Sequence, residues 1–170
     1  MRAFYIGRFQ PYHLGHQAIL QQIAERADEV AVAIGSAQRS HTLDDPFTAG
    51  ERMMMVVDSL KGVIPIPFYV IPLEDVERNS VWVSNVKSMT PPFDAAYSNN
   101  PLVARLFREA GVKVRHSPLY KRNEYSGTEI RRRMVAGEKW EHLVPKAVVR
   151  ILREVRGVQR LKDLAKGDQE

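Results

Sequence analysis

Short apolar runs alternate with longer amphipathic stretches along most of the chain. Apolar runs bounded by glycine, proline or polar residues lie at 3–6, 30–34, 68–71, 95–97 and 112–114. The continuous run 30–34, ended by Gly35, is typical of a strand buried on both faces of a parallel sheet. Apolar residues at helical spacing lie between them, over about 14–26, 48–60, 82–87 and 101–111. The alternation predicts a doubly wound α/β domain.

Two capping boxes mark the starts of predicted helices. Thr48 and Glu51 have the required spacing before one helix, and Ser126 and Glu129 have it before another, which we expect to end at Gly137. Each pair should satisfy two of the main-chain N–H groups that a helix start leaves without partners. The start of the second helix should also attract an anion.

The last third of the chain is helical in pattern. Apolar residues at helical spacing run from Pro145 to Val155 and continue over 161–164, and we expect residues 166–170 to fray. We find no internal repeat and no linker. The chain should therefore form a single domain over residues 1–170, with a mostly parallel sheet of five or six strands, helices on both faces and a helical C-terminus.

Composition agrees with a globular domain that has a real core. The chain has 170 residues, 44% of them hydrophobic and 26% charged, and a chain of this size buries roughly 70% of its unfolded surface. No apolar run approaches the roughly 18 residues that a membrane span needs, and Met1 and Arg2 lead directly into the first strand without a signal peptide. We therefore expect a cytoplasmic protein. The absence of cysteine excludes disulfides and thiol chemistry.

The positive charge of the chain is concentrated in one segment. The net charge is +5, and residues 121–160 hold eleven Lys or Arg against five Asp or Glu. A basic segment suits a polyanionic partner such as a nucleotide triphosphate, a nucleic acid or an acidic neighbouring subunit. The alternative is that most of these side chains cover solvated helix faces.

A strand-to-helix turn over residues 7–16 carries the strongest chemical signal. Gly7 lets a ligand approach the backbone, Pro11 stiffens the loop, and the imidazoles of His13 and His16 lie three residues apart. We expect free N–H groups at the start of the following helix to favour an anion there. The pattern predicts a phosphate site.

A zinc site is the alternative use of these histidines. The chain has no cysteine and only three other, scattered histidines, which makes a set of three or four ligands improbable. Ligands of parallel sheets bind beyond the carboxyl ends of the strands. The loops at Gly7 and Gly35 should therefore face each other across one crevice, and the polar stretch 74–79 should reach the same edge.

The turn resembles a known signature. Residues 7–16, GRFQPYHLGH, are similar to the G-x-F-x-P-x-H-x-G-H signature of the nucleotidylyltransferase superfamily. With residues 35–41 and 126–131, nearly the whole chain resembles the archaeal type of nicotinamide-mononucleotide (NMN) adenylyltransferase. The resemblance implies a Rossmann-like fold. It also implies adenylyl transfer from ATP to NMN, by in-line attack on the α-phosphorus without a covalent enzyme intermediate.

The resemblance also implies an ATP site built from both motifs. Its residues are Gly7, Arg8, Phe9, His13, His16, Ser126, Gly127, Thr128 and Arg131. We expect His13, His16, Arg8 and Arg131 to be catalytic, with His16 on the transferred phosphoryl group and the arginines on the triphosphate. Many relatives have a second serine where this chain has Gly127. Helix capping alone is the alternative role of Ser126.

The acceptor site implied by the resemblance lies on later loops. Its residues are Ser36, Asp75, Val76, Asn79, Trp82 and Asn99. Trp82 could stack on the pyridinium cation and Asn79 could bind the carboxamide; the alternative for Trp82 is core packing. We expect no dedicated protein metal site, because Mg²⁺ would be held through the ATP phosphates and water.

Other activities of the superfamily share the first motif. The closest alternative is an adenylyltransferase for flavin mononucleotide or phosphopantetheine, or a cytidylyltransferase. A basic nucleic-acid-binding module is a rival of another class, but the basic segment lacks interleaved aromatic residues. We expect the small molecules ATP and NMN as partners, without membrane or nucleic acid. The resemblance implies a homo-oligomer, for which a hexamer is one candidate.

Overall fold

The computed structural model describes residues 1–117, 121 and 123–167. Its strands are β1 (Arg2–Gly7), β2 (Glu29–Ile34), β3 (Phe68–Pro72), β4 (Ala95–Tyr97) and β5 (Lys113–Arg115). Its helices are α1 (Leu14–Ala24), α2 (Ala49–Leu60), α3 (Trp82–Met89), α4 (Pro101–Glu109), α5 (Gly127–Ala136), α6 (Lys146–Glu154) and α7 (Gly157–Ala165), with 3₁₀ turns η1 (Asn79–Val81) and η2 (Glu141–Leu143). The stretch 118–125, whose sequence predicts a loop, and the predicted frayed tail lie partly outside the described residues.

The five strands form one sheet in the order β3-β2-β1-β4-β5. Every pairing is parallel, with Arg2 opposite Glu29 and Tyr5 opposite Tyr97. The chain builds β1, β2 and β3 toward one edge and then crosses to place β4 and β5 on the other side of β1. This reversal beside β1 opens a crevice at the carboxyl ends of the strands, where α/β proteins bind ligands. The prediction of a Rossmann-like, doubly wound sheet is confirmed.

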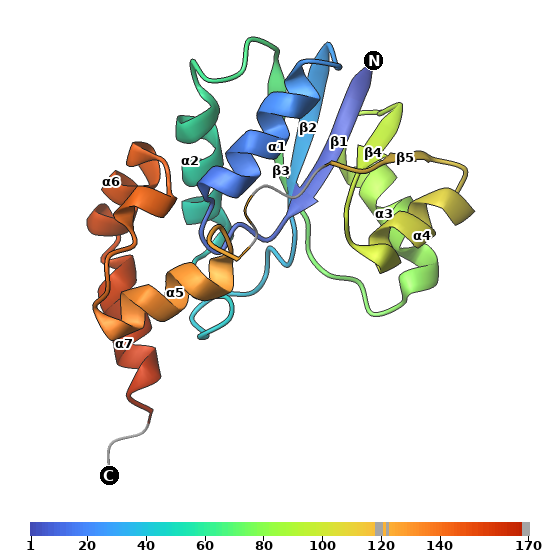
Figure 1. Ribbon diagram of the computed structural model, residues 1–170. Helices are drawn as coiled ribbons and strands as arrows, with labels where there is room; N and C mark the ends of the chain where they lie inside the picture. Colours follow the sequence, from blue (N-terminus) through green and yellow to red (C-terminus); the bar gives the residue numbers. More distant parts are fainter. Residues whose placement is uncertain (118–120, 122, 168–170) are drawn as a thin grey trace.

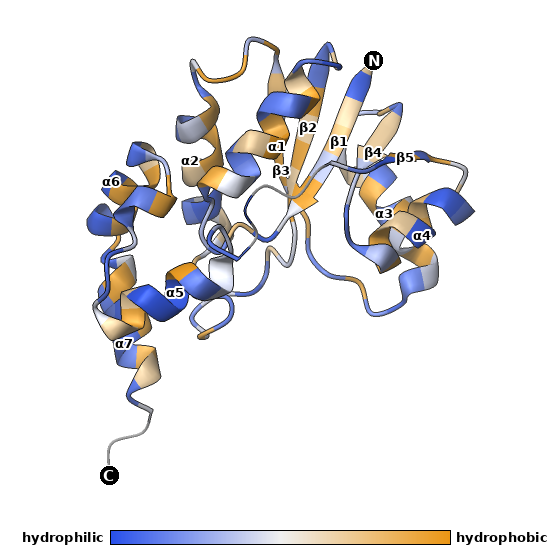
Figure 2. Ribbon diagram, in the orientation of Figure 1, coloured by the Kyte–Doolittle hydropathy of each residue, from blue (hydrophilic) through white to orange (hydrophobic). Residues whose placement is uncertain are grey.

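Alternate residues of the central strands supply two separate cores. In β2, Val30, Val32 and Ile34 pack with α1, α2 and α5–α7, whereas Ala31 and Ala33 pack with α3 and α4. Figure 1 shows these two groups of helices on opposite sides of the sheet. Figure 2 shows hydrophilic and hydrophobic residues interspersed along the helices, as expected for helices that cover a sheet.

Helix ends follow the predicted local chemistry with small shifts. Thr48 and Glu51 form the predicted capping box of α2, and Pro101 is the first residue of α4, behind the cap of Asn100. Helix α1 ends at Ala24, two residues earlier than predicted. No helix in the described part of the chain has the length and apolar character that crossing a bilayer requires.

Candidate active site

The turn between β1 and α1 is closed by its two histidines. His13 is the N-cap of α1, and its Nδ1 accepts hydrogen bonds from the main-chain N–H groups of Gly15 (3.1 Å) and His16 (3.3 Å). His16 Nδ1 accepts in return from the His13 main-chain N–H at 3.2 Å. The prediction that these N–H groups are free to bind an anion is therefore wrong: the side chain at the helix start already occupies them.

These hydrogen bonds determine which nitrogen of each ring carries a proton. A nitrogen that accepts from an N–H group is unprotonated, so a neutral His13 or His16 carries its proton on Nε2. Burial lowers the pKa of His13 to about 4. Burial, and then the neighbouring His13, place the pKa of His16 well below its ordinary value. With ring centroids 3.6 Å apart, the pair presents two neutral N–H donors at pH 7.

Phe9 supports the histidines from the core side. Its ring is 1% exposed and meets the His16 ring edge-on at a centroid distance of 4.8 Å. A Cβ at Gly7 would lie 2.8 Å from this ring, so the glycine makes room for Phe9. The side chain of the predicted ATP-site residue Phe9 therefore positions His16 from behind.

The start of α5 packs directly on the histidine turn. Arg131 is buried and donates from Nη1 to the main-chain carbonyl of Gln10 at 2.8 Å. A Cβ at Gly127 would lie 3.0 Å from the same Gln10 oxygen and 2.8 Å from Arg131 Nη1. Glycine at position 127 thus allows the two motifs, which lie far apart in the sequence, to meet.

The predicted second capping box is only half formed. The Ser126 hydroxyl accepts from the main-chain N–H of Glu129 at 3.2 Å, so Ser126 does cap α5. The Glu129 carboxylate binds Arg132 and Arg133 instead of returning to the N-cap, and these guanidinium groups lower the pKa of Glu129 to about 2. The carboxylate therefore binds two nearby cations in preference to a main-chain N–H group.

Three adjoining cavities meet at this turn. The histidine cavity, of about 480 Å³, is lined by His13, His16, Asn99, Ser126 and Gly127 among others. The arginine cavity, of about 170 Å³, is lined by Arg8, Phe9, Gln10, His13, His16, Gly127, Thr128 and Arg131. The Trp82 cavity, of about 370 Å³, includes Gly7, Arg8, Ser36, Asp75, Asn79 and Trp82. The histidines border the first two cavities and Arg8 borders the last two.

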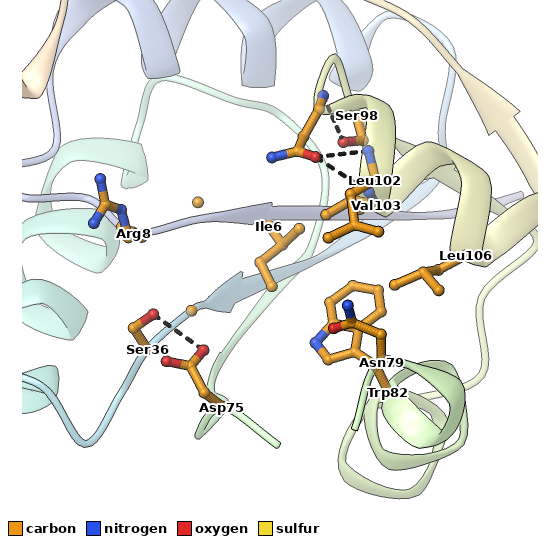
Figure 3. Close-up of a pocket in the computed structure, with 13 residues that line it drawn as sticks. Ile6, Arg8, Ser36, Asp75, Asn79, Trp82, Ser98, Leu102, Val103 and Leu106 are labelled. Atoms are coloured by element: carbon orange, nitrogen blue, oxygen red, sulfur yellow. Dashed lines mark hydrogen bonds between the residues drawn. The ribbon is translucent and has the colours of Figure 1, made fainter. Parts of the chain in front are cut away.

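The Trp82 cavity combines an aromatic side with a polar side. Figure 3 shows Asn79 and Trp82 together at one end and Arg8 at the other. Trp82 is half-buried and meets Phe107 edge-on at 5.2 Å. Trp82 therefore packs on the core and also lines the cavity, and its stacking on a pyridinium stays a prediction. Apolar side chains of α4 that the sequence analysis did not single out complete the wall: Leu102, Val103 and Leu106.

Asp75 joins the loops that follow β2 and β3. Its carboxylate accepts from the Ser36 hydroxyl and from Gln38 Nε2, each at 3.1 Å. Two of the residues predicted for the NMN site lie elsewhere. Asn99 lines the histidine cavity and donates to the Ser117 carbonyl at 2.7 Å, and Val76 is half-buried and lines none of the three cavities.

Two adjacent carboxylates face the predicted phosphate arginines. The buried Asp45 pairs with Arg8 at 3.3 Å, and the exposed Asp44 lies 3.8 Å from Arg131. In the described residues, no group of three or more His, Asp or Glu could hold a metal ion.

Known proteins share this sequence and architecture. Residues 4–133 match the family model described as cytidylyltransferase-like. Over 167 residues the chain is 63% identical to the nicotinamide-nucleotide adenylyltransferase of Methanosarcina barkeri, covering 98% of this chain and 96% of that protein. It is 55% identical over 173 residues to the protein of the same name from Archaeoglobus fulgidus, covering 99% of each.

A solved structure with low sequence identity shares the fold. It is a bifunctional NMN adenylyltransferase/ADP ribose pyrophosphatase from Francisella tularensis, complexed with AMP and a Mn ion, with a TM-score of 0.77 and 20% identity. The match covers 97% of this chain, which spans about half (52%) of that protein. With the relatives at 63% and 55% identity, the chain belongs to the cytidylyltransferase-like family and, within it, to the nicotinamide-nucleotide adenylyltransferases.

Proposed function

We propose that this protein transfers the adenylyl group of ATP to NMN, forming NAD and releasing pyrophosphate. The observation that carries the proposal is the pair of neutral Nε2–H donors of His13 and His16, held where the arginine and histidine cavities meet. Neutral N–H donors can hydrogen-bond the oxygens of the phosphoryl group during transfer and stabilise the negative charge that develops on them.

The reaction needs no protein nucleophile. A phosphate oxygen of NMN attacks the α-phosphorus of ATP, and the bond to the bridging oxygen of the β-phosphate breaks as pyrophosphate leaves. The protein has to align the two substrates and stabilise the charge that develops on the phosphoryl oxygens. We assign His16 to the α-phosphoryl oxygens and His13 to a neighbouring phosphate oxygen, with Arg8 and Arg131 neutralising the triphosphate.

ATP is assigned to the two cavities beside the histidines. The arginine cavity suits the triphosphate, since Arg8, Thr128 and Arg131 line it. The histidine cavity suits the adenosine, and Asn99 and Ser126 on its wall offer polar contacts. We propose that ATP enters as its magnesium complex, with the cation held by phosphate oxygens and water. Phosphate charge would then displace Asp44 and Asp45 from the arginines that they face in the free protein.

NMN is assigned to the Trp82 cavity. The electron-rich indole of Trp82 suits the pyridinium cation, Asn79 can pair with the carboxamide, and Ser36 and Asp75 lie where the ribose hydroxyls would be. Arg8, which borders both this cavity and the arginine cavity, would receive the attacking phosphate. We assign no contact to Val76.

The test is pyrophosphate release from Mg-ATP with a panel of acceptors. NMN, its nicotinic acid form, flavin mononucleotide and phosphopantetheine are each supplied with the full chain, and the product is identified by mass. We expect release with a pyridine mononucleotide and formation of the corresponding dinucleotide. Release only with flavin mononucleotide or phosphopantetheine would show that this compound, and not NMN, is the acceptor. Release with none of the four would overturn the proposed function.

A further inference from the structure

Arg52 is a fully buried arginine behind the active site. It lies on α2 with 0% of its surface exposed, on the same helix face as the buried Met55 and Val56. It does not line the histidine, arginine or Trp82 cavity, so it has no path to a bound substrate. A buried charge costs free energy unless it is well hydrogen-bonded, and the partners of Arg52 therefore indicate what it does.

The guanidinium of Arg52 joins the loops that follow β1 and β2. Nη1 donates to two carbonyl oxygens, those of Arg8 and Gly35, at 2.9 Å each. Further hydrogen bonds run from Nη2 and Nε to the carbonyl oxygens of Ser36 (3.1 Å), Ala37 (3.5 Å), Arg39 (3.2 Å) and Thr48 (3.2 Å). All of these acceptors are main-chain carbonyls and none is a carboxylate. The guanidinium therefore holds the main chain of these loops and not a charged side chain.

Both loops contain a residue in the left-handed region at this point. Phe9 has φ of 54° and Ser36 has φ of 49°, a conformation that residues other than glycine keep only where their surroundings hold it. The Arg8 carbonyl belongs to the peptide that precedes Phe9. The Gly35 and Ser36 carbonyls belong to the peptides on either side of Ser36. Arg52 thus binds the peptides that border both strained residues.

We propose that Arg52 is a positioning residue for adenylyl transfer, holding the two loops in the left-handed conformation that turns Arg8 and Ser36 into the Trp82 cavity. The proposal rests on the proposed function, because it concerns the same site. Figure 3 shows both side chains at this cavity. Packing alone does not account for an arginine here, since an apolar residue would fill the space without the cost of burying a charge.

The first test is Arg52→Lys in the full chain. Lysine keeps the charge, but its single ammonium group has three donors and cannot reproduce the planar fork. We expect kcat per folded molecule to fall about 10- to 100-fold, because small misplacements of reacting groups cost rate, and KM for NMN to rise more than KM for ATP, because Arg8 and Ser36 line the proposed NMN cavity. The matched control is Met55→Ala on the same buried face, which loses stability without touching the loops and should keep kcat once the fraction folded is corrected.

A second measurement does not depend on activity. In a crystal structure of Arg52→Met, we expect the φ angle of Phe9 or Ser36 to leave the left-handed region and the Arg8 side chain to move. Loops with unchanged backbone angles would overturn the inference, as would Arg52→Lys with kcat within threefold of wild type. If the wild-type chain transfers no adenylyl group, the proposed function fails and the catalytic part of the inference fails with it, whereas the loop angles still report on the positioning.

Discussion

Each histidine of the active-site turn has two functions, one on each ring nitrogen. Nδ1 of His13 and of His16 accepts main-chain hydrogen bonds at the start of α1, which leaves Nε2 of each ring as the donor. The same contacts that cap the helix therefore orient the proposed catalytic rings and determine their tautomer. A substitution here can change stability and turnover separately, depending on which nitrogen the new side chain replaces.

His16→Ala should reduce turnover far more than it reduces binding. The variant loses a donor that is most valuable in the transition state, and a single such donor contributes on the order of a hundred- to a thousandfold in rate. We expect kcat to fall by about that factor and KM for ATP to change little, measured by pyrophosphate release. His142→Ala, which removes an exposed histidine of η2, is the control. A His16→Ala protein with near-normal turnover would contradict the catalytic assignment.

His13 should make the protein less stable in mild acid. Its folded-state pKa is about 4 and its unfolded value is about 6.5, so between these values the unfolded chain binds a proton that the folded chain does not. The contribution of His13 to the free energy of unfolding is therefore complete above pH 6.5 and decreases as the pH falls. For His13 alone the loss from pH 7 to pH 5 is about 2 kcal/mol.

His13→Asn isolates this effect. Asparagine is also a good N-cap, but it does not titrate. Urea unfolding at pH 5, 6 and 7 should show a smaller acid-induced loss of stability in the variant, by about 2 kcal/mol at pH 5. The other ionisable groups are common to both proteins, and removal of His13 also lessens the lowering of the His16 pKa, which changes the acid-induced loss in the same direction. An equal pH dependence in the two proteins would show that His13 titrates normally in the folded state.

At the scale of elements, periodicity and capping chemistry were enough to predict the fold. The run 30–34 is a fully buried strand, and the Thr48 capping box begins α2 as predicted. The Ser126 box failed in its second half because Arg132 and Arg133 lie one turn from Glu129 and bind its carboxylate. Which of several partners a flexible carboxylate selects depends on geometry that residue spacing does not contain.

The candidate site was predictable where a motif names its residues and less so elsewhere. The motif residues do converge, as predicted for His13, His16, Arg8 and Arg131. The role of Gly127, in contrast, depends on its distance to Gln10, which lies far away in the sequence. Arg52 was missed, although one signal was present: it is a charged residue on the apolar face of a predicted helix. The sequence could not predict that main-chain carbonyls would be the partners of Arg52, because every residue has a main-chain carbonyl.

Trp82 at the start of α3 should determine affinity for NMN. Removing the indole in Trp82→Ala removes its contact with the pyridinium cation, and such contacts contribute about 1–2 kcal/mol in desolvated sites. We expect KM for NMN to rise roughly 5- to 30-fold, while KM for ATP stays within about twofold. Trp82→Phe keeps an aromatic face and the packing on Phe107, so its effect should be smaller. Equal changes in both KM values would rule out stacking.

At the scale of the whole molecule, several arginines of the basic segment 121–160 bind carboxylates within the protein. Arg132 and Arg133 pair with Glu129, and Arg150 pairs with Asp58 of α2. Arg131 instead reaches the arginine cavity. Most of the Lys and Arg side chains that the structure describes in this segment are nevertheless exposed, which fits the alternative of solvated helix faces. The described part of the segment packs α5–α7 against the rest of the domain, and we propose that the whole chain is one domain.

The C-terminal helix is connected to the active-site loop through Arg160. From α7 its guanidinium binds the Glu51 carboxylate through two hydrogen bonds, of 2.7 and 2.8 Å, and donates to the Pro46 carbonyl at 3.0 Å. Glu51 is also the partner of Thr48 in the capping box, and Pro46 follows Asp45, which faces Arg8. Residues beyond the family match at 133 thus support the loop that carries Asp45, the partner of Arg8.

Arg160→Met should destabilise the protein more than Arg150→Met, although both arginines bind a carboxylate of α2. The Arg160–Glu51 pair is largely shielded, with side-chain exposures of 18% and 13%, against 60% and 30% for Arg150–Asp58. Loss of Arg160 leaves the shielded Glu51 carboxylate without its cationic partner, which we expect to cost about 2 kcal/mol at this partial exposure, whereas an exposed pair contributes less than about 1 kcal/mol. Urea unfolding at pH 7 gives both values. If the two variants lose the same stability, the α7 contact is an ordinary surface ion pair, and the support that Arg160 gives to the Pro46 loop is negligible.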